Sequence, residues 1–318
     1  MKKRILTFLL PAMTVWANPT EATAETTQTT EETKATADAL TLSAETAVLM
    51  DARSGKVLYD KNADQKMYPA SITKLMTLLL TLEKGSLSDE ITFSHDAIYS
   101  IEPGSAHIAI MEGETLTLEQ VVRAIILRSA NEASNGAAEY VDGSIEAFAK
   151  HMTEKAKELG CKNTNFVNAN GLHDENHYTT ACDMALIAKA LLQNESYRSI
   201  MSETYYEIPP TNKQVETRYL HGQHQMLNSR SLYYYPDAIG GKTGFTTEAM
   251  NTLVTYAKRD NTELIAVVMK CNGAEHYVDT AALFDYGFAN YETVKAFSAE
   301  EHAKAVSVTE TYKKKTTE

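Results

Sequence analysis

Apolar positions divide the chain into strand-like and helix-like stretches. Two pairs of short apolar runs flank polar turns, residues 46–50 with 56–59 and residues 251–257 with 263–269. Each pair predicts an antiparallel hairpin. Between them, the spacing of apolar residues predicts a series of helices over residues 118–127, 131–140, 145–159 and 181–192. A closing helix over residues 281–288 would cover the sheet.

This order of elements places strands at both ends of the folded part and inserts helices between them. It predicts an α+β fold, in which an antiparallel sheet is flanked by helices and carries an inserted all-α subdomain. A cleft at the junction of the two halves is where a ligand site commonly lies.

The two ends of the chain have a different composition. A basic start precedes an apolar stretch from Ile5 to Trp16 that is too short for a comfortable membrane span. We therefore expect residues 1–24 to be a cleaved signal peptide and the protein to be exported to the cell envelope or secreted. Residues 25–43, rich in Thr and Glu, predict a disordered linker before a folded domain over 44–290 and a polar tail over 291–318.

Charge and cysteine content exclude some classes. Forty-two acidic residues against 30 Lys and Arg give a net charge of −12, which argues against nucleic acid as a partner. Lysines near the C-terminus leave open contact with an anionic membrane or cell-wall surface. The three cysteines, Cys161, Cys182 and Cys271, are too few and odd in number to imply a disulfide framework.

Candidate chemistry begins with Ser71 and Lys74, three residues apart at the start of a strongly apolar run. Pro69 suits a first helical turn, so the two side chains would share one helix face. Serine becomes a good nucleophile when a base takes its proton, and burial or a nearby cation can turn a lysine into that base. The pair alone is equally compatible with a capped core helix.

Two further elements complete a possible site. Ser129 and Asn131 fall between two predicted helices, and Lys242, Thr243 and Gly244 lie on a predicted edge strand. Each has an ordinary structural explanation, such as a helix cap or a strand entry. In this order, however, Ser-x-x-Lys, Ser-x-Asn and Lys-Thr-Gly are the signature of penicillin-binding proteins and class A β-lactamases.

The sequence resembles the low-molecular-mass penicillin-binding proteins, the serine D-alanyl-D-alanine carboxypeptidases of peptidase family S11. The likeness covers residues 44–290 and includes landmarks at 69–77, 166–168 and 177–180. It implies a penicillin-binding, serine β-lactamase-like transpeptidase fold. It also implies an enzyme that removes the terminal D-alanine from peptidoglycan stem pentapeptides ending in D-Ala-D-Ala, through a Ser71 acyl-enzyme, and that β-lactam antibiotics inhibit covalently.

The resemblance also implies catalytic roles. Ser71 would attack the carbonyl between the two D-alanines, and Lys74 would take its proton. Ser129 would pass a proton to the leaving amine, while Asn131 would position the peptide amide.

Substrate binding is implied for the edge strand. Lys242 would keep Lys74 unprotonated through like-charge repulsion and help Thr243 bind the terminal carboxylate. Gly244 would let the substrate backbone lie close. The backbone N–H groups of Ser71 and Phe245 would form an oxyanion hole.

The chain departs from the family in two respects. Family members often have Asp after the Ser-x-Asn asparagine, where this chain has Glu132. Better-known members carry a second, β-rich domain and an amphipathic C-terminal helix, and we expect both to be missing or truncated here, which puts C-terminal membrane attachment in doubt.

Other activities remain as alternatives. Two pairs of histidines have spacings near those of metal ligands, namely His173 with His177 and His221 with His224. Both pairs fall in polar, loop-like segments, so we expect no metal or cofactor. Class A β-lactamases add a deacylating glutamate, and no Glu-x-x-Leu-Asn stretch lies between Asn131 and Lys242, so we expect slow turnover of penicillins. A D,D-endopeptidase or a β-lactamase on the same fold, a transpeptidase and a catalytically quiet peptidoglycan-binding module remain as alternatives.

Overall fold

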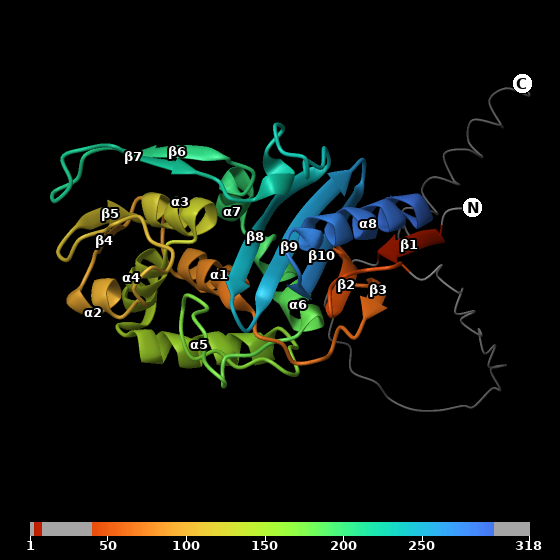
Figure 1. Cartoon of the computed structure of the whole chain (residues 1–318), viewed down its shortest axis with the longest axis horizontal. Coiled ribbons are helices and arrows are strands. Elements are labelled where there is room, and N and C mark those ends of the chain that lie inside the picture. Colours follow the sequence, from red (N-terminus) through yellow and green to blue (C-terminus); the bar gives the residue numbers. More distant parts are fainter. Residues whose placement is uncertain (1–2, 8–39, 296–318) are drawn as a thin grey trace, which may run out of the picture.

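A five-stranded antiparallel sheet forms the centre of the molecule (Figure 1). The computed structural model describes residues 3–7 and 40–295. The strand order is β3-β2-β10-β9-β8. The bounds are β2 Thr46–Asp51, β3 Val57–Lys61, β8 Ala238–Thr246, β9 Met250–Arg259 and β10 Thr262–Cys271. Both predicted hairpins are confirmed, and β8 lies at the edge of the sheet.

Alternation along β10 divides the core between the two faces of the sheet. Ile265, Val267 and Met269 belong to one apolar cluster, which continues into the helical part of the molecule. Leu264, Ala266 and Val268 point to the opposite face. They belong to a second apolar cluster, which lies under helix α8 (Glu275–Asn290). The predicted closing helix is therefore confirmed and begins six residues earlier. Helix α6 (Ala181–Leu191) packs on the opposite face of the sheet.

The helical half is inserted between β3 and β8. Its elements are η1 Ala70–Thr73, α1 Lys74–Lys84, β4 Glu90–Thr92, α2 His95–Tyr99, β5 Thr115–Thr117, α3 Leu118–Arg128, α4 Asn131–Asp142, α5 Ile145–Glu158, α7 Glu195–Ile200, β6 Tyr205–Ile208, β7 Arg218–His221 and η2 Gln225–Leu227. Side-chain caps begin several helices: Thr117 and Gln120 form a capping box at α3, and Ser144 caps α5. All four helices predicted between the hairpins are present, and their ends differ by no more than two residues.

Helix α1 lies in the middle of this half (Figure 1). Every residue from Lys74 to Leu82 is buried, as the apolar run predicts. The helix contacts α3, α4, α5 and α6, so its position is determined on several sides. It can therefore hold a side chain rigidly at its N-terminal end.

Two short strands, one from each terminal part of the described chain, pair with each other. Strand β1 (Lys3–Thr7) pairs in parallel with β11 (Tyr291–Lys295), which opens the predicted tail. The rest of the predicted signal peptide, nearly all of the linker and the remainder of the tail lie outside the described residues. Within the described residues, no helix is long and apolar enough to cross a membrane. The three cysteines are free thiols in the structure.

Candidate active site

Ser71 lies on a short turn of 3₁₀ helix that leads directly into α1. The preceding residue, Ala70, has φ +51°, a left-handed conformation that is uncommon outside glycine. Gly171 packs against this turn, and a Cβ atom there would lie 2.0 Å from the Ala70 carbonyl oxygen. The nucleophile segment is therefore held in a sharp bend that requires glycine at position 171.

The Lys74 amine lies next to the Ser71 hydroxyl, with 3.1 Å between Nζ and Oγ. Its other two partners are Asn131 Oδ1 at 2.7 Å and the Asn170 carbonyl oxygen at 2.5 Å. These two oxygens can only accept, so each takes an N–H from the amine. A neutral lysine has two N–H groups and one lone pair, and the lone pair would then face Ser71 Oγ.

The electrostatic surroundings favour that neutral form. Lys74 is fully buried, and burial lowers the pKa of its amine well below the ordinary value. The positive charge of Lys242 lowers the pKa of Lys74 further, while Glu132 opposes both effects. Lys242 itself is 2% exposed, and burial lowers its pKa to about 7. Burial is therefore the larger influence on Lys74 and like-charge repulsion the second.

The junction of α3 and α4 supplies the two residues of the Ser-x-Asn motif. Ser129 ends α3 with φ +57°, and Asn131 is the first residue of α4. The Ser129 hydroxyl is buried and has no hydrogen-bond partner among the described residues. The Asn131 side chain points inward to Lys74 and is 3% exposed.

Edge strand β8 closes the other side of the site. A Cβ atom on Gly244 would lie 2.9 Å from the backbone nitrogen of Ser71 and 2.4 Å from Thr252 Oγ1. A side chain here would push the strand away from the nucleophile. The Lys242 Nζ atom donates to the Thr243 carbonyl at 2.7 Å. The Phe245 side chain is 65% exposed and projects from the strand.

These elements enclose a cavity of about 290 Å³. Five of the predicted residues line it, namely Ser71, Ser129, Thr243, Gly244 and Phe245. Lys74, Asn131 and Lys242 are buried behind its walls. The cavity is completed by residues that the sequence did not single out: Ala106, Gln223, Asn251, His276 and Tyr277. The hydroxyl-bearing residues Ser71, Ser129 and Thr243 thus line one space beside a buried amine.

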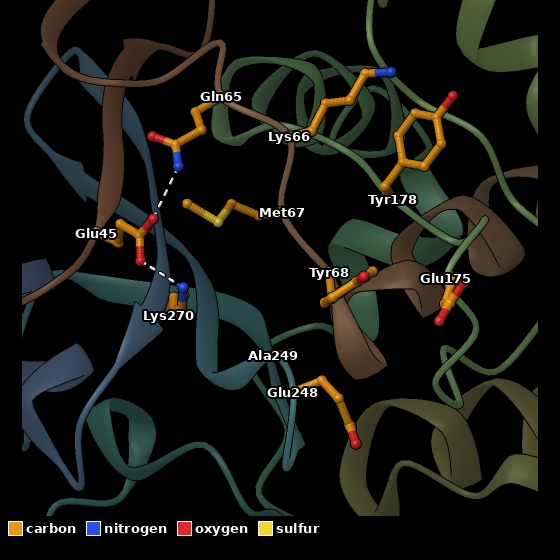
Figure 2. A pocket seen from close by; sticks show the side chains of 10 residues that line it. All are labelled: Glu45, Gln65, Lys66, Met67, Tyr68, Glu175, Tyr178, Glu248, Ala249 and Lys270. Atoms are coloured by element: carbon orange, nitrogen blue, oxygen red, sulfur yellow. Dashed lines mark hydrogen bonds and ion pairs between the residues drawn. The ribbon is translucent and has the colours of Figure 1, made fainter.

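A second cavity, of about 310 Å³, lies at the end of the sheet and contains none of the predicted site residues (Figure 2). Two of its charged groups pair with each other. Glu45 accepts a hydrogen bond from Gln65 at 2.8 Å and pairs with Lys270 at 2.7 Å. The Lys66 amine lies 4.1 Å from the centre of the Tyr178 ring. This cavity has no nucleophile and base comparable to Ser71 and Lys74.

The histidines are used in packing and hydrogen bonding. His177 Nδ1 accepts from the Val167 amide at 3.1 Å, so its other nitrogen donates to Thr73 Oγ1 at 2.8 Å. Burial lowers the pKa of His177 to about 3. His173 lies edge-on to Tyr68 and 3.9 Å from a Glu248 oxygen. No group of three or more His, Cys, Asp or Glu side chains within the described residues is arranged to hold a metal ion.

Solved structures with the same architecture are those of enzymes named for related activities. A variant of the Streptomyces K15 DD-transpeptidase superposes with a TM-score of 0.73 and 25% identity, over 79% of this chain and all of that one. A D-alanyl-D-alanine carboxypeptidase from Mycobacterium tuberculosis H37Rv gives a TM-score of 0.70 at 27% identity, over 78% and 92% of the two chains. The fold is that of the penicillin-binding D,D-peptidases, and the predicted fold class is confirmed.

Sequence comparison narrows the class to a family. A family model described as D-alanyl-D-alanine carboxypeptidase, peptidase S11, matches residues 30–273. The chain is 36% identical over 299 residues to the D-alanyl-D-alanine carboxypeptidase DacF of Bacillus subtilis (strain 168), covering 92% of this chain and 72% of that protein. It is 34% identical to DacC of Escherichia coli (strain K12), covering 81% and 64%. The chain belongs to the serine-type D-alanyl-D-alanine carboxypeptidase family.

Proposed function

We propose that this chain is a D,D-carboxypeptidase that removes the terminal D-alanine from peptidoglycan stem pentapeptides through an acyl-enzyme on Ser71. The observation that carries the proposal is the setting of Lys74. Its amine is buried, two acceptors occupy its N–H groups, and Ser71 Oγ is its remaining polar neighbour. This arrangement suits a general base that takes the proton from the attacking hydroxyl.

Acylation would follow from that geometry. Lys74 takes the Ser71 proton as Oγ attacks the carbonyl carbon of the penultimate D-alanine. The backbone N–H groups of Ser71 and Phe245 would donate to the oxygen that becomes negatively charged. The unpartnered hydroxyl of Ser129 would then relay a proton to the leaving amine, and D-alanine departs as the C–N bond breaks.

The edge strand would orient the substrate. Thr243 lines the cavity and can donate to the terminal carboxylate, and the Lys242 charge lies directly behind it. Asn131, which holds Lys74, would also contact the peptide amide. Gly244 lets the strand lie close to the backbone of the nucleophile, where a side chain would collide with it, so the glycine is explained by this contact and not, as the sequence had suggested, by room for the substrate. The outer N–H and C=O groups of this edge strand would pair with the peptide backbone.

Water would then attack the ester carbonyl of the acyl-enzyme and release the tetrapeptide. If an amine attacked the same acyl-enzyme in place of water, the enzyme would act as a transpeptidase. The similarity to the Streptomyces DD-transpeptidase makes transpeptidation the second candidate activity. Incubation with a pentapeptide, read by mass spectrometry with and without an amine, separates the two. We expect D-alanine release without the amine and loss of release in Ser71→Ala. A wild type that binds the peptide and releases no D-alanine would contradict the proposal.

The same serine would be acylated by penicillins, whose strained amide takes the place of the D-Ala-D-Ala bond. We expect the penicilloyl enzyme to persist long enough for detection by mass spectrometry. Rapid turnover of penicillin would instead indicate a β-lactamase.

A peptidoglycan substrate places the reaction outside the cytoplasm, which agrees with the predicted signal peptide. We propose that the mature protein is exported and acts at the cell wall, and that its C-terminal lysines contact the anionic membrane or cell-wall surface. Mass spectrometry of the protein recovered from the envelope and the medium would locate the mature N-terminus. Recovery in the cytoplasm with residues 1–24 intact would contradict export.

A further inference from the structure

Glu132 is a buried carboxylate that the proposed mechanism does not use. It lies in the first turn of α4, next to Asn131, and is 1% exposed. Its Oε1 atom accepts hydrogen bonds, whereas Oε2 has no partner in the part of the chain that the structure describes. Burial raises the pKa of this carboxyl. A half-satisfied buried acid is poor for stability, so its presence calls for another explanation.

The carboxylate holds a strained segment. Glu132 Oε1 accepts from the backbone N–H of Ile108 at 2.7 Å and from that of Ile110 at 3.4 Å. Between them, Ala109 has φ +57°, a conformation that an alanine rarely adopts. From the other side, Arg218 donates to the Ala109 carbonyl at 2.8 Å. The bend at Ala109 is therefore over-determined by contacts, as strained backbone at functional sites usually is.

The same segment reaches the cleft. Ala106 lines the catalytic cavity, and its carbonyl accepts from the Asn131 backbone N–H at 2.9 Å. The Asn131 side chain in turn contacts Lys74 at 2.7 Å. A movement of residues 106–110 would therefore shift both a wall of the cavity and the residue that orients the base.

We propose that Glu132 is a positioning residue for acylation, which holds residues 106–110 on the N-terminus of α4 and thereby keeps Asn131 and Lys74 aligned with Ser71. The inference rests on the proposed function of Ser71 and Lys74. Glu132 does not touch the reacting atoms: it positions them through Asn131, and its charge separately raises the pKa of Lys74. The glutamate has the reach to bridge two amides, and an aspartate at this position is one methylene shorter.

The test resolves penicillin acylation into a binding constant and a first-order acylation rate. We expect Glu132→Ala to lower the acylation rate at least about tenfold, since small misplacements of reacting groups cost large factors. The binding constant should change less than about threefold, because the edge strand is untouched. Glu132→Gln keeps an oxygen for both amides and should restore the rate to within about threefold of wild type.

The matched control is Glu139→Ala, two turns further along α4, which removes a carboxylate that accepts from Ser94 Oγ at 2.7 Å. It should leave the acylation rate unchanged. An unchanged rate in Glu132→Ala, or an equal fall in the alanine and glutamine variants, would overturn the inference. If the alanine variant does not fold, Glu132→Asp decides: a rate at least threefold below that of the glutamine variant supports positioning, and an equal rate overturns it.

Hydrogen exchange separates this inference from the proposed function, because it needs no acylation. The Ile108 and Ile110 amides should lose protection in Glu132→Ala and keep it in Glu132→Gln. Unchanged protection in the alanine variant would overturn the anchoring role. Wild-type protein that is not acylated at Ser71 would contradict the proposed function alone.

Discussion

The two walls of the cleft differ in burial and in freedom. On the helical wall, Lys74 and Asn131 are buried, and the Lys74 amine contacts Ser71 Oγ, Asn131 Oδ1 and the Asn170 carbonyl. On the strand wall, β8 is a sheet edge from which the Phe245 side chain projects, 65% exposed. Proton transfer requires fixed distances and a dry amine, whereas docking of a peptide requires open backbone groups. The difference assigns chemistry to the helices and recognition to the strand.

Replacing the proposed base, Lys74, tests this assignment of roles with the largest expected effect. Lys74→Arg retains a buried cation that cannot accept a proton at any accessible pH. We expect the rate of penicillin acylation to fall about 10³-fold, within the range that a general base contributes. The rate would be followed with a fluorescent penicillin under conditions where binding is saturated.

The matched control is Lys84→Arg, the same substitution in the last turn of the same helix, where the side chain is exposed. It should leave acylation unchanged. Near-normal acylation of Lys74→Arg would mean that the base lies elsewhere and that the helical wall does not carry the chemistry.

Lys242 tests whether the strand wall acts through binding. Lys242→Met removes the charge behind Thr243 and should lower kcat/KM for a pentapeptide by about 10- to 100-fold, as expected for a lost charged hydrogen bond. The charge of Lys242 lowers the pKa of Lys74, so its removal raises that pKa. The acidic limb of the pH–acylation profile should therefore move to higher pH, because Lys74 loses its proton only at a higher pH.

A peptide amidated at its C-terminus is the control for the first effect. It has no carboxylate to recognise, so above the acidic limb of both pH profiles wild type and variant should process it at similar rates. An equal loss with the amidated peptide, or an acidic limb displaced to lower pH, would contradict the division of roles between the two walls.

Gly244 lies where the walls meet. In Gly244→Ala the new Cβ would clash with Thr252 Oγ1 and with the Ser71 backbone, so β8 must shift from the nucleophile. We expect the acylation rate to fall about tenfold. Gly143→Ala is the control, because its φ of +78° imposes strain while no atom lies within 4 Å of the new Cβ. That control should lose stability and keep its acylation rate; wild-type acylation in Gly244→Ala would remove the argument for close approach.

Much of this arrangement could be predicted from the sequence. Apolar periodicity gave the helices and hairpins, because those elements bury one face each. Ser71, Ser129 and Lys242 could be placed in one site because their motifs occur in a known order. Their convergence on one cavity or behind its walls agrees with that prediction.

Other contacts had no readable signal. The partner of Lys74 at position 170 is a backbone carbonyl, which every residue possesses. Glu132 departs from the usual aspartate, but its role depends on an irregular segment over residues 106–110 whose path the sequence pattern does not reveal. His276 and Tyr277 reach the cavity because α8 begins earlier than its apolar spacing indicates.

The smallest predicted effect concerns the support of the helical wall. His177 donates to Thr73, beside Lys74, and burial lowers the pKa of its ring to about 3 from an ordinary value of 6.5. Below pH 6.5 the unfolded chain binds a proton that the folded chain does not, so stability is lost as pH falls toward 3. His177 should contribute up to about 1.4 kcal/mol of this loss per pH unit.

Urea unfolding of wild type and His177→Gln between pH 7.5 and pH 4.5 measures that contribution directly. The glutamine cannot titrate, so the variant should lose less stability on acidification, even if it is less stable at pH 7.5. Thr73→Val removes the acceptor of the histidine N–H and keeps the histidine, so it should be less stable at every pH with the wild-type slope. Equal slopes in wild type and His177→Gln would mean that the pKa of His177 is the same in the folded and the unfolded chain, and that burial does not keep this ring neutral beside Lys74.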